Sequence, residues 1–433
     1  MNCRAISSLA VTLLVSTAAS SVSANTDING LFDARSTAMA GTGAAFIDSA
    51  GAIPINPALL DQIGKLRLTV DGTLLVAQPQ APYTVTHSSS DGGTYKNYET
   101  VRSDRAYGPL FFVGAAYRVL DRVVVGAAVY PLLGMGTHAE YRPSPDLSPK
   151  LRIRTESAAG LLEVGIPISV RILDNLSVAA MWRISYMSQS ATQPVSPDGM
   201  IRDASGNPVY AKLDVSGWNF GGLQLGVFYK PLPSLRLGFT YRSKVQVTGT
   251  GTTTTTNPAD GMQLKLDTTA PFTNPHILRA GVAWTTLQDK LLIAADFKYL
   301  FYAEAYKNIT TTVVMDGMPI DTVTVTKWKN AYAIQLGGEY AAFDEVSFRA
   351  GYTMVMSATP KDYAMAAMAP PGASHGVSIG VGLHVIDNLS LDAAAEYIAY
   401  SVKVDKATQH NAGVGTYASN SGQFGLSATY RMQ

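Results

Sequence analysis

The segment LLIAADFKYLF, residues 291–301, decides the fold because apolar and more polar positions alternate along it. One face carries Leu291, Ile293, Ala295, Phe297, Tyr299 and Phe301, and the other carries Leu292, Ala294, Asp296 and Lys298. Alternation with a period of two predicts a β-strand, since successive side chains of a strand point to opposite sides. The segment therefore predicts a strand that separates an apolar environment from a polar one.

Similar segments recur from residue 66 to the C-terminus, separated by connections of two kinds. Tight turns lie at residues 120–122, 173–175, 230–234, 287–290, 342–345 and 386–388. Long polar connections lie at 77–105, 134–155, 188–214, 248–275, 303–328, 357–373 and 404–418. Short and long connections that interleave in this way predict fourteen strands with both barrel ends on the short-turn side. An even number of antiparallel strands closes without an edge, so we expect an all-β, 14-stranded antiparallel transmembrane β-barrel.

A secreted soluble β protein is the alternative fold, because its strands also alternate. The gathering of all long connections on one side argues against a soluble sandwich. Charged residues make up 15% of the chain, below the ~25% usual for soluble domains. Aromatic residues near strand ends predict interfacial girdles; they are Trp182, Tyr186, Tyr241, Trp284, Tyr340 and Tyr430.

A helical membrane protein is excluded by the length of the apolar runs. The two strongest, residues 107–117 and 123–136, end before the roughly 17 residues that a spanning helix needs. Each is long enough for a tilted strand.

The first residues predict export. Arg4 is followed by an uncharged run, residues 5–21, and then by Val22-Ser23-Ala24, which has small residues at the positions that signal peptidase selects. Residues 1–24 are therefore the expected signal peptide, and cleavage removes Cys3, the one cysteine in the sequence. Without Arg4 the basic and acidic residues number 32 each. This balance predicts no nucleic-acid partner.

The residues before the first strand differ from the rest. Residues 31–46 are small and compatible with helix, and they lead through 49–54 to Asn56-Pro57-Ala58. A segment of this size cannot form a core alone, but it can fill a barrel lumen. We therefore divide the mature chain into an N-terminal plug, residues 25–64, and a barrel, residues 65–433.

Here the chain resembles the FadL-type outer-membrane transporters of fatty acids and hydrocarbons. The resemblance rests on AMAGTGAA at 38–45, DSA at 48–50 and NPA at 56–58. It continues with WKN at 328–330, LGGEY at 336–340, FRAGY at 348–352 and SATP at 357–360. These pieces cover both ends of the mature chain in the order of the family. The tripeptide Asn-Pro-Ala alone is weak evidence for the family, because it recurs at residues 257–259.

The resemblance implies a plug, called the hatch, inside a monomeric barrel of the Gram-negative outer membrane. It implies that hydrophobic ligands enter between loops 188–214 and 248–275, occupy a lumenal pocket and leave sideways through the wall. Asn56, Pro57 and Ala58 would meet an inward-kinked strand there. By position that strand is the third, residues 123–133, where Gly126 and Gly134 permit a bend.

Two departures from the family leave the substrate open between fatty acids and aromatic or aliphatic hydrocarbons. The expected mature chain begins with the polar residues 25–29, and it ends at Gln433 without a terminal aromatic. The expected partners are the hydrophobic ligand, outer-membrane lipid or lipopolysaccharide, and the barrel-insertion machinery. No cofactor is expected.

Strand parity places a set of charged residues in the lumen. The cations are Arg118, Arg183, Arg236, Arg242, Arg279, Lys298, Arg349 and Arg431, and the anions are Glu163, Asp296, Glu339, Asp392 and Glu396. One interpretation is a network of ion pairs that holds the hatch. The other is that Arg183, Arg279 and Arg349 bind a ligand carboxylate.

Signals for catalysis or metal binding are weak. Ser378 lies in a G-x-S-x-G pattern, but within an alternating strand rather than at a strand-to-helix elbow. The six histidines have no metal-ligand spacing. Residues 252–256 and 91–93 have the composition of solvated loops. We expect no enzyme; the alternatives to transport are an outer-membrane hydrolase and a loop-based adhesin or receptor.

Overall fold

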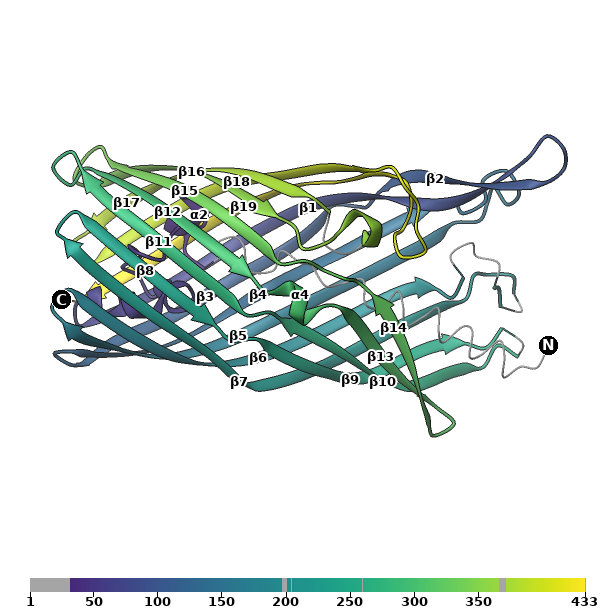
Figure 1. Cartoon of the computed structure of the whole chain (residues 1–433), viewed down its shortest axis with the longest axis horizontal. Helices are drawn as coiled ribbons and strands as arrows, with labels where there is room; N and C mark the ends of the chain where they lie inside the picture. Colours follow the sequence, from purple (N-terminus) through teal and green to yellow (C-terminus); the bar gives the residue numbers. More distant parts are fainter. Residues whose placement is uncertain (1–31, 197–200, 204, 259, 366–370, 433) are drawn as a thin grey trace.

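The computed structural model forms a closed antiparallel β-barrel around a small helical segment (Figure 1). It describes residues 32–196, 201–203, 205–258, 260–365 and 371–432. The expected signal peptide lies outside these residues. Strand β1 (Leu66–Ser88) pairs with β19 (Gly415–Met432) and thereby closes the wall.

Fourteen strands make up the wall, as predicted. After β1 they are β3 (Ala106–Leu120), β4 (Val123–Tyr141), β5 (Ile153–Leu173), β6 (Leu176–Pro194), β7 (Tyr210–Leu232), β8 (Leu235–Arg242), β11 (Ile277–Thr286), β12 (Leu291–Leu300), β15 (Ala331–Ala341), β16 (Val346–Met356), β17 (Ala373–Ile386), β18 (Leu389–Val404) and β19. The tight turns gather at one end of the barrel and the long connections at the other (Figure 1).

Further strands extend the wall on the long-connection side: β2 (Thr94–Arg102), β9 (Val245–Thr256), β10 (Gln263–Asn274), β13 (Asn308–Met315) and β14 (Met318–Val325). The expectation that 77–105 and 248–275 are loops is therefore wrong for most of their length. Residues 252–256 lie in β9, with Thr253 and Thr255 buried, because β-branched threonine favours a pleated surface. Residues 91–93 do form an exposed turn.

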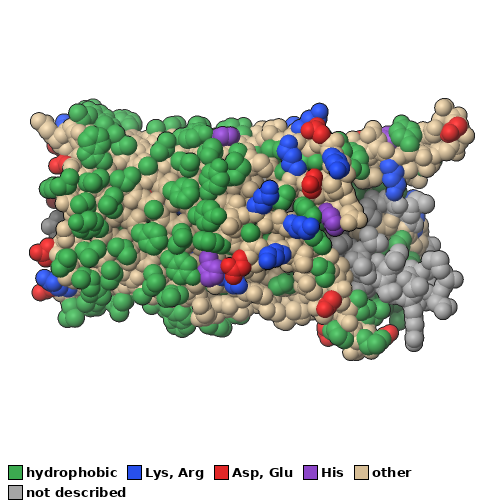
Figure 2. Space-filling view, in the orientation of Figure 1, with side chains coloured by type: hydrophobic (Ala, Val, Ile, Leu, Met, Phe, Trp, Pro, Cys, Tyr) green, Lys and Arg blue, Asp and Glu red, His purple; other side chains and the backbone are tan. Residues whose placement is uncertain are grey.

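The alternation of the first quoted segment has the predicted orientation. In β12, Ile293 and Phe297 are exposed on the outside of the barrel, whereas Asp296 and Lys298 are buried. On the visible face, apolar side chains cover the half of the barrel near the tight turns, and charged side chains gather on the other half and at the rim (Figure 2). The apolar band is the surface expected to face lipid.

The hatch occupies the lumen near the tight turns (Figure 1). It contains α2 (Ala34–Ala38), α3 (Ala52–Ile55) and the 3-10 helix η2 (Pro57–Gln62), and it is followed directly by β1. Two other short helices, α4 (Tyr302–Ala305) and η3 (Lys361–Tyr363), lie in the long connections. Among the described residues, no helix is long and apolar enough to cross a membrane.

Candidate functional site

The short hatch helices begin at side chains that replace missing backbone partners. Asp33 accepts a hydrogen bond from the backbone N–H of Ser36 at the start of α2. Asn56 accepts one from Ala58 at the start of η2, where Pro57 supplies the fixed φ that suits a first helical residue. Helices this short are not stable in isolation. The barrel wall must therefore hold the hatch in place.

One side of the hatch is held by charges. Arg35 donates to Glu339 at 2.6 Å, and Arg349 donates to the same carboxylate at 2.5 Å and to Asp392 at 2.6 Å. Asp296 accepts from the backbone N–H groups of Gly43 and Ala44, each at 3.0 Å. We call this set of contacts, between residues 33–44 and strands β11, β12 and β15–β18, the charged side.

The backbone of the hatch also lies directly against the wall on the charged side. A Cβ atom on Gly337 would lie 2.6 Å from the Cβ of Met39, and one on Gly351 would lie 2.6 Å from the nitrogen of Ala40. Both positions therefore require glycine, because any side chain would displace the hatch. The hydroxyl of Ser378 donates to the carbonyl of Ala38 at 2.9 Å. Ser378 thus binds the hatch, rather than standing at a nucleophile elbow.

Five of the lumenal cations predicted from parity, Arg118, Arg183, Arg242, Arg279 and Arg349, are found in ion pairs, whereas Arg236 and Arg431 donate to the hydroxyl groups of Thr285 and Ser390. Arg183 and Arg242 both contact Glu163 at 2.8 Å, and all three side chains are buried. Arg279 contacts Asp296 at 2.7 Å and donates to the carbonyl of Gly41. For Arg183, Arg279 and Arg349 this geometry favours the ion-pair interpretation, because their guanidinium groups already meet carboxylates.

The end of the hatch has a second ionic contact. Asp61 in η2 accepts from Arg171 at 2.9 Å and from Ser177 at 2.7 Å, and it lies 3.3 Å from Arg118. Against the cost of burial, the hydrogen bond from Arg171 lowers the pKa of Asp61. This carboxylate therefore stays ionised and ties η2 to β3, β5 and β6.

Asp33 behaves in the opposite way. Burial, helped by the charge of Asp392, raises the pKa of Asp33 to about 6, against the hydrogen bonds from Ser49 and Ser36. At neutral pH Asp33 is therefore ionised, and its ionisation lowers the stability of the folded hatch relative to the protonated form.

The partner of Asn56-Pro57-Ala58 differs from the expectation. The Asn56 amide donates to Ala44 at 2.7 Å and to Val227 of β7 at 3.1 Å, and the carbonyl of Ala58 accepts from Ser169 of β5 at 3.2 Å. The hydrogen bonds of the tripeptide thus go to β5 and β7 rather than to the third wall strand. Which strands residues 56–58 contact depends on the orientation of the hatch inside the closed barrel. The order of strands in the sequence does not determine that orientation.

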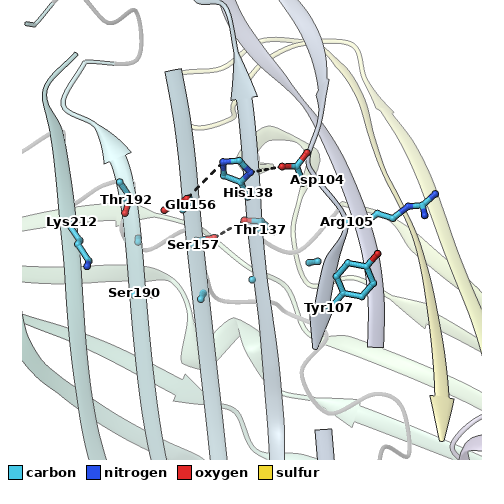
Figure 3. A pocket seen from close by; sticks show the side chains of 14 residues that line it. Asp104, Arg105, Tyr107, Thr137, His138, Glu156, Ser157, Ser190, Thr192 and Lys212 are labelled. Carbon is cyan, nitrogen blue, oxygen red and sulfur yellow. Dashed lines mark hydrogen bonds and ion pairs between the residues drawn. The ribbon is translucent and has the colours of Figure 1, made fainter. Parts of the chain in front are cut away.

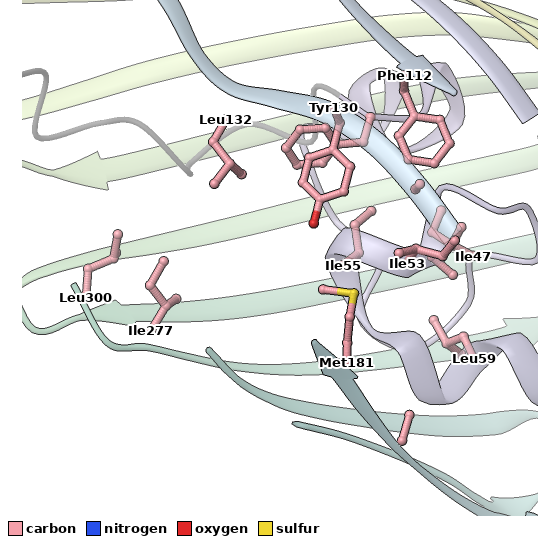
Figure 4. Close-up of a cluster of buried hydrophobic side chains, with 14 of the residues drawn as sticks. Ile47, Ile53, Ile55, Leu59, Phe112, Tyr130, Leu132, Met181, Ile277 and Leu300 are labelled. Atoms are coloured by element: carbon pink, nitrogen blue, oxygen red, sulfur yellow. The ribbon is translucent and has the colours of Figure 1, made fainter. Parts of the chain in front are cut away.

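The hatch meets the third wall strand, β4, through apolar side chains. The side chain of Ile53 lies 3.3 Å from where a Cβ on Gly126 would stand. Next to it, the ring of Tyr130 packs 5.0 Å from that of Phe32 and 6.1 Å from that of Phe112. Figure 4 shows Ile47, Ile53 and Ile55 on the side of the hatch that faces the rings of Tyr130 and Phe112. We call these contacts of residues 46–55 with β3–β6 the apolar side.

Strand β4 is irregular between its two glycines. Its register with β5 shifts between Pro131 and Leu133, and the extra residue, Leu132, is buried. An extra residue bends a strand and interrupts its pairing. The ladder with β3 runs only as far as the pair Val113 and Val129.

Beyond that pair, β3 and β4 face each other without ladder pairs in the described structure. This stretch, Ala106–Phe112 of β3 and 130–137 of β4, we call the seam. At its far end the N–H of Asp104 donates to the carbonyl of His138 at 2.8 Å. A Cβ on Gly108 would lie 2.6 Å from the carbonyl oxygen of Gly134, so the two backbones touch there without pairing. Unpaired backbone is costly in lipid, and the seam is therefore a weak line in the wall.

A second interruption, in β7, is bridged by side chains. One extra residue is inserted here, so that Phe220 and Gly221 of β7 lie opposite Ile184 of β6. Here Asn219 donates to the carbonyl of Gln246 at 2.8 Å, and Ser243 accepts from the N–H of Leu223 at 2.8 Å. Within the described residues, no side-chain hydrogen bond joins Ala106–Phe112 to 130–137 in this way, and the one between Asp104 and His138 lies beyond the far end of the seam. The seam is therefore the better candidate for an opening.

Apolar side chains continue from the seam into the lumen. Leu132, Met187, Val247 and Phe272 belong to the same buried cluster as the hatch residues. The cluster ends at an aromatic group around α4, in which the ring of Tyr306 lies 6.1 Å from that of Tyr302 and 4.6 Å from that of Trp328. This group was not predicted from the sequence, because it lies in and beside the connection 303–328, which was expected to be polar.

In the described ranges, no three His, Cys, Asp or Glu side chains are arranged to hold a metal ion.

Comparison with known proteins agrees with this architecture. A family model described as outer membrane protein transport protein (OMPP1/FadL/TodX) matches residues 9–432. Similar solved structures include a FadL homologue of Pseudomonas aeruginosa, with 18% identity and a TM-score of 0.71 over 93% of this chain and 98% of that one. The P. putida toluene transporter TodX has 18% identity and a TM-score of 0.71 over 94% and 100%.

The Ralstonia pickettii toluene transporter TbuX is 20% identical, with a TM-score of 0.66 over 93% of this chain and 98% of that one. A search of curated proteins finds no match. The match of the family model over nearly the whole chain confirms the resemblance seen in the sequence, and the chain belongs to the OMPP1/FadL/TodX family of outer membrane transport proteins.

Proposed function

We propose that this protein transports hydrophobic small molecules passively across the Gram-negative outer membrane and releases them sideways through the seam. The observation that carries the proposal is the unpaired stretch of β3 and β4 in the wall of a plugged barrel. A plug disfavours a simple aqueous channel. A weak line in the wall offers an exit into lipid.

The apolar lining of the lumen supports the route. An apolar ligand gains roughly 0.8 kcal/mol for each methylene that leaves water, and so a path along Phe272, Met187 and Leu132 is favoured over an aqueous one. In this proposal the ligand first meets the long connections, 188–214 and 248–275, and then moves through the lumenal cluster to the seam. The barrel works as a monomer without a cofactor.

The substrate class follows from the lining and from the relatives. The titles of two similar structures name toluene transporters, and an apolar, partly aromatic lumen suits aromatic or aliphatic hydrocarbons and fatty acids alike. We assign Gly126 and Gly134 to the gate, since they flank the bulge at Leu132. We assign Asn56, Pro57 and Ala58 to anchoring the hatch against β5 and β7.

A reversible cross-link across the seam tests the route. In the double variant Gly108→Cys with Gly134→Cys, a disulfide would hold β3 and β4 together, and the mature chain would carry no other thiol. We expect uptake of toluene, oleate or an alkane by cells carrying the oxidised variant to fall to background and to recover with a reductant.

The matched control places the same disulfide where the strands are already paired and face outward, as Val113→Cys with Val129→Cys. Uptake through the control should not depend on the redox state. Unchanged uptake through a barrel whose seam is shown by mass spectrometry to be cross-linked would overturn lateral exit. No uptake of any of the three compounds by the unmodified protein would overturn the transport function itself.

A further inference from the structure

A group of lysines lies on the outside of the molecule, on the long-connection side. Lys and Arg side chains gather on this half of the visible face (Figure 2). The lysines come from three connections, residues 301–330, 357–365 and 405–414, which follow β12, β16 and β18. All five are exposed, and we call them the lysine patch: Lys307, Lys327, Lys329, Lys361 and Lys406.

Backbone contacts between the connections bring these lysines together in pairs. The N–H of Lys327 donates to the carbonyl of Lys307 at 3.1 Å. The side-chain amide of Asn411 donates to the carbonyls of Lys361 and Lys406, at 3.5 and 2.9 Å. Two pairs of lysines that are distant in the sequence are therefore neighbours in the structure.

An aromatic contact joins the two pairs. The ammonium group of Lys327 lies 5.6 Å from the centre of the Tyr363 ring, and Tyr363 is two residues from Lys361. The fifth lysine reaches the same connection, because the N–H of Lys329 donates to the carbonyl of Ala358 at 2.8 Å. The five lysines thus belong to one continuous surface.

Nearby carboxylates do not neutralise the patch. Glu304 pairs with Lys244 at 4.0 Å, and Asp405 pairs with Lys403 at 3.4 Å. Outside the hairpin of β13 and β14, the remaining carboxylate in the described parts of the three connections is Asp362. Among the residues that the structure describes, none of the five patch lysines forms an ion pair. The excess of positive charge attracts anions.

The outward-facing groove over β3–β7 lacks this excess (Figure 3). Among its lining residues, Asp104 and Glu156 balance Arg105 and Lys212. The two carboxylates also lie 2.6 and 3.9 Å from His138. Positive charge is therefore concentrated at the lysine patch, rather than spread evenly around the long-connection side.

Aromatic residues place the patch at the level of lipid headgroups. Tyr299, Tyr332 and Tyr352 lie on the outward faces of β12, β15 and β16, near the ends of these strands on the long-connection side. Such residues mark the border between acyl chains and headgroups. Lys329 is three residues from Tyr332, which is roughly 10 Å of extended chain. The patch therefore begins in the headgroup layer.

The patch is also separate from the proposed exit. It stands over β12–β18, whereas the seam lies between β3 and β4. The strands β19 and β1 lie between β18 and β3 in the wall. A molecule bound at the patch therefore leaves the seam uncovered.

We propose that the lysine patch binds the phosphate-bearing headgroup of an anionic glycolipid in the outer leaflet. Lysine ammonium groups bind phosphate as point charges, and several of them on one surface can meet more than one phosphate. The acyl chains of such a lipid would lie along the apolar band below Tyr299 and Tyr332. A soluble anion would gain nothing from that band. The binding does not depend on the transport route.

The test measures lipid binding to the full-length folded barrel in detergent by native mass spectrometry. The probe is lipid A with two phosphates, compared with phosphatidylglycerol, phosphatidylethanolamine and inorganic phosphate. Each basic side chain near an anionic lipid surface contributes about fivefold in affinity. We therefore expect lipid A to bind tightest, and its binding to weaken by roughly tenfold or more in the triple variant Lys327→Gln, Lys361→Gln, Lys406→Gln.

Two further variants separate charge at the patch from other effects. Arginine at the same three positions keeps the charge and should keep the affinity within about twofold. The matched control, Lys150→Gln, Lys212→Gln, Lys265→Gln, removes three exposed lysines of other connections and strands and changes the net charge equally. Its affinity for lipid A should also stay within about twofold.

Three outcomes would overturn the proposal. The first is an equal loss of affinity in the patch variant and the matched control. The second is equal binding of phosphatidylglycerol or phosphatidylethanolamine, which would show that a phosphate-rich glycolipid is not preferred. The third is displacement of lipid A by inorganic phosphate at the same concentration, which would identify a soluble anion as the occupant.

Discussion

The two sides of the hatch are held by different forces. On the charged side, buried ion pairs and close backbone contacts join residues 33–44 to β11, β12 and β15–β18. On the apolar side, Ile47, Ile53 and Ile55 pack against β3–β6 without charges of their own. A charge pair is directional and costly to break, whereas apolar packing tolerates small shifts.

This difference assigns a role to each side. The charged side and the ionic contacts of Asp61 with β3 and β5 position the hatch at its two ends, and the apolar side between them, which lies beside the seam, is where movement costs least. The two interruptions of the wall also differ in how firmly they are held. Side chains of Asn219 and Ser243 bridge the one in β7, whereas no such side chains bridge the seam among the described residues. The gate proposed here therefore lies where both the hatch and the wall are held least specifically.

The largest expected effect comes from removing one carboxylate of the charged side. Asp296→Ala leaves Arg279 and two backbone N–H groups of the hatch without their partner. We expect a loss of about 3–5 kcal/mol in the free energy of unfolding, since one member of a buried ion pair is left alone. Urea unfolding of the purified barrel measures this loss.

The control for that variant is Asp174→Ala, whose side chain is 95% exposed and pairs with Arg122 in a tight turn. Its effect should be within about 0.5 kcal/mol. Similar losses for both variants would mean that the charged side does not hold the hatch.

An intermediate effect is expected from pH, through Asp33. Because its pKa is raised to about 6, its contribution to folding is fully present below the pKa of the unfolded chain and is lost as pH rises through about 6. Between pH 4 and pH 7, the ionisation of Asp33 lowers the free energy of unfolding by at most about 3 kcal/mol. Asp61, with its lowered pKa, acts in the opposite sense only at more acidic pH.

Limited proteolysis of the hatch across this range is the measurement. Cleavage should increase from pH 5 to pH 7 in the unmodified protein and vary less in Asp33→Asn, which keeps an acceptor for Ser36. The exposed control Asp174→Asn should follow the unmodified protein. An unchanged pH profile in Asp33→Asn would show that another group governs the docking of the hatch.

The smallest effect is expected on the apolar side. Ile53→Val removes one methylene from a buried side chain and should cost about 0.5–1.5 kcal/mol. Urea unfolding should show a smaller loss than for Asp296→Ala, with the same dependence on denaturant. A loss as large as that of Asp296→Ala would remove the distinction between the two sides.

Much of the barrel could be predicted from the sequence, because alternate residues of a strand point to opposite faces and neighbouring residues alone reveal this alternation. Asp296 and Lys298 were placed in the lumen, and Ile293 and Phe297 on the outside, from alternation alone. The long connections were predicted less well, since the threonines of β9 have a polar composition but a strand conformation. Nothing local distinguishes such a strand from a solvated loop until its partner, β10, is known.

The sequence by itself determined the fourteen strands, the side on which the long connections lie, the charges inside and the hatch that precedes the wall. Only the tertiary structure decided which charges meet, that Asn56 contacts β7, and that the wall is unpaired between Gly108 and Gly134. The physical reason is distance along the chain: Arg35 and Glu339 are 304 residues apart. Their contact exists only because the closed barrel brings β15 to the hatch.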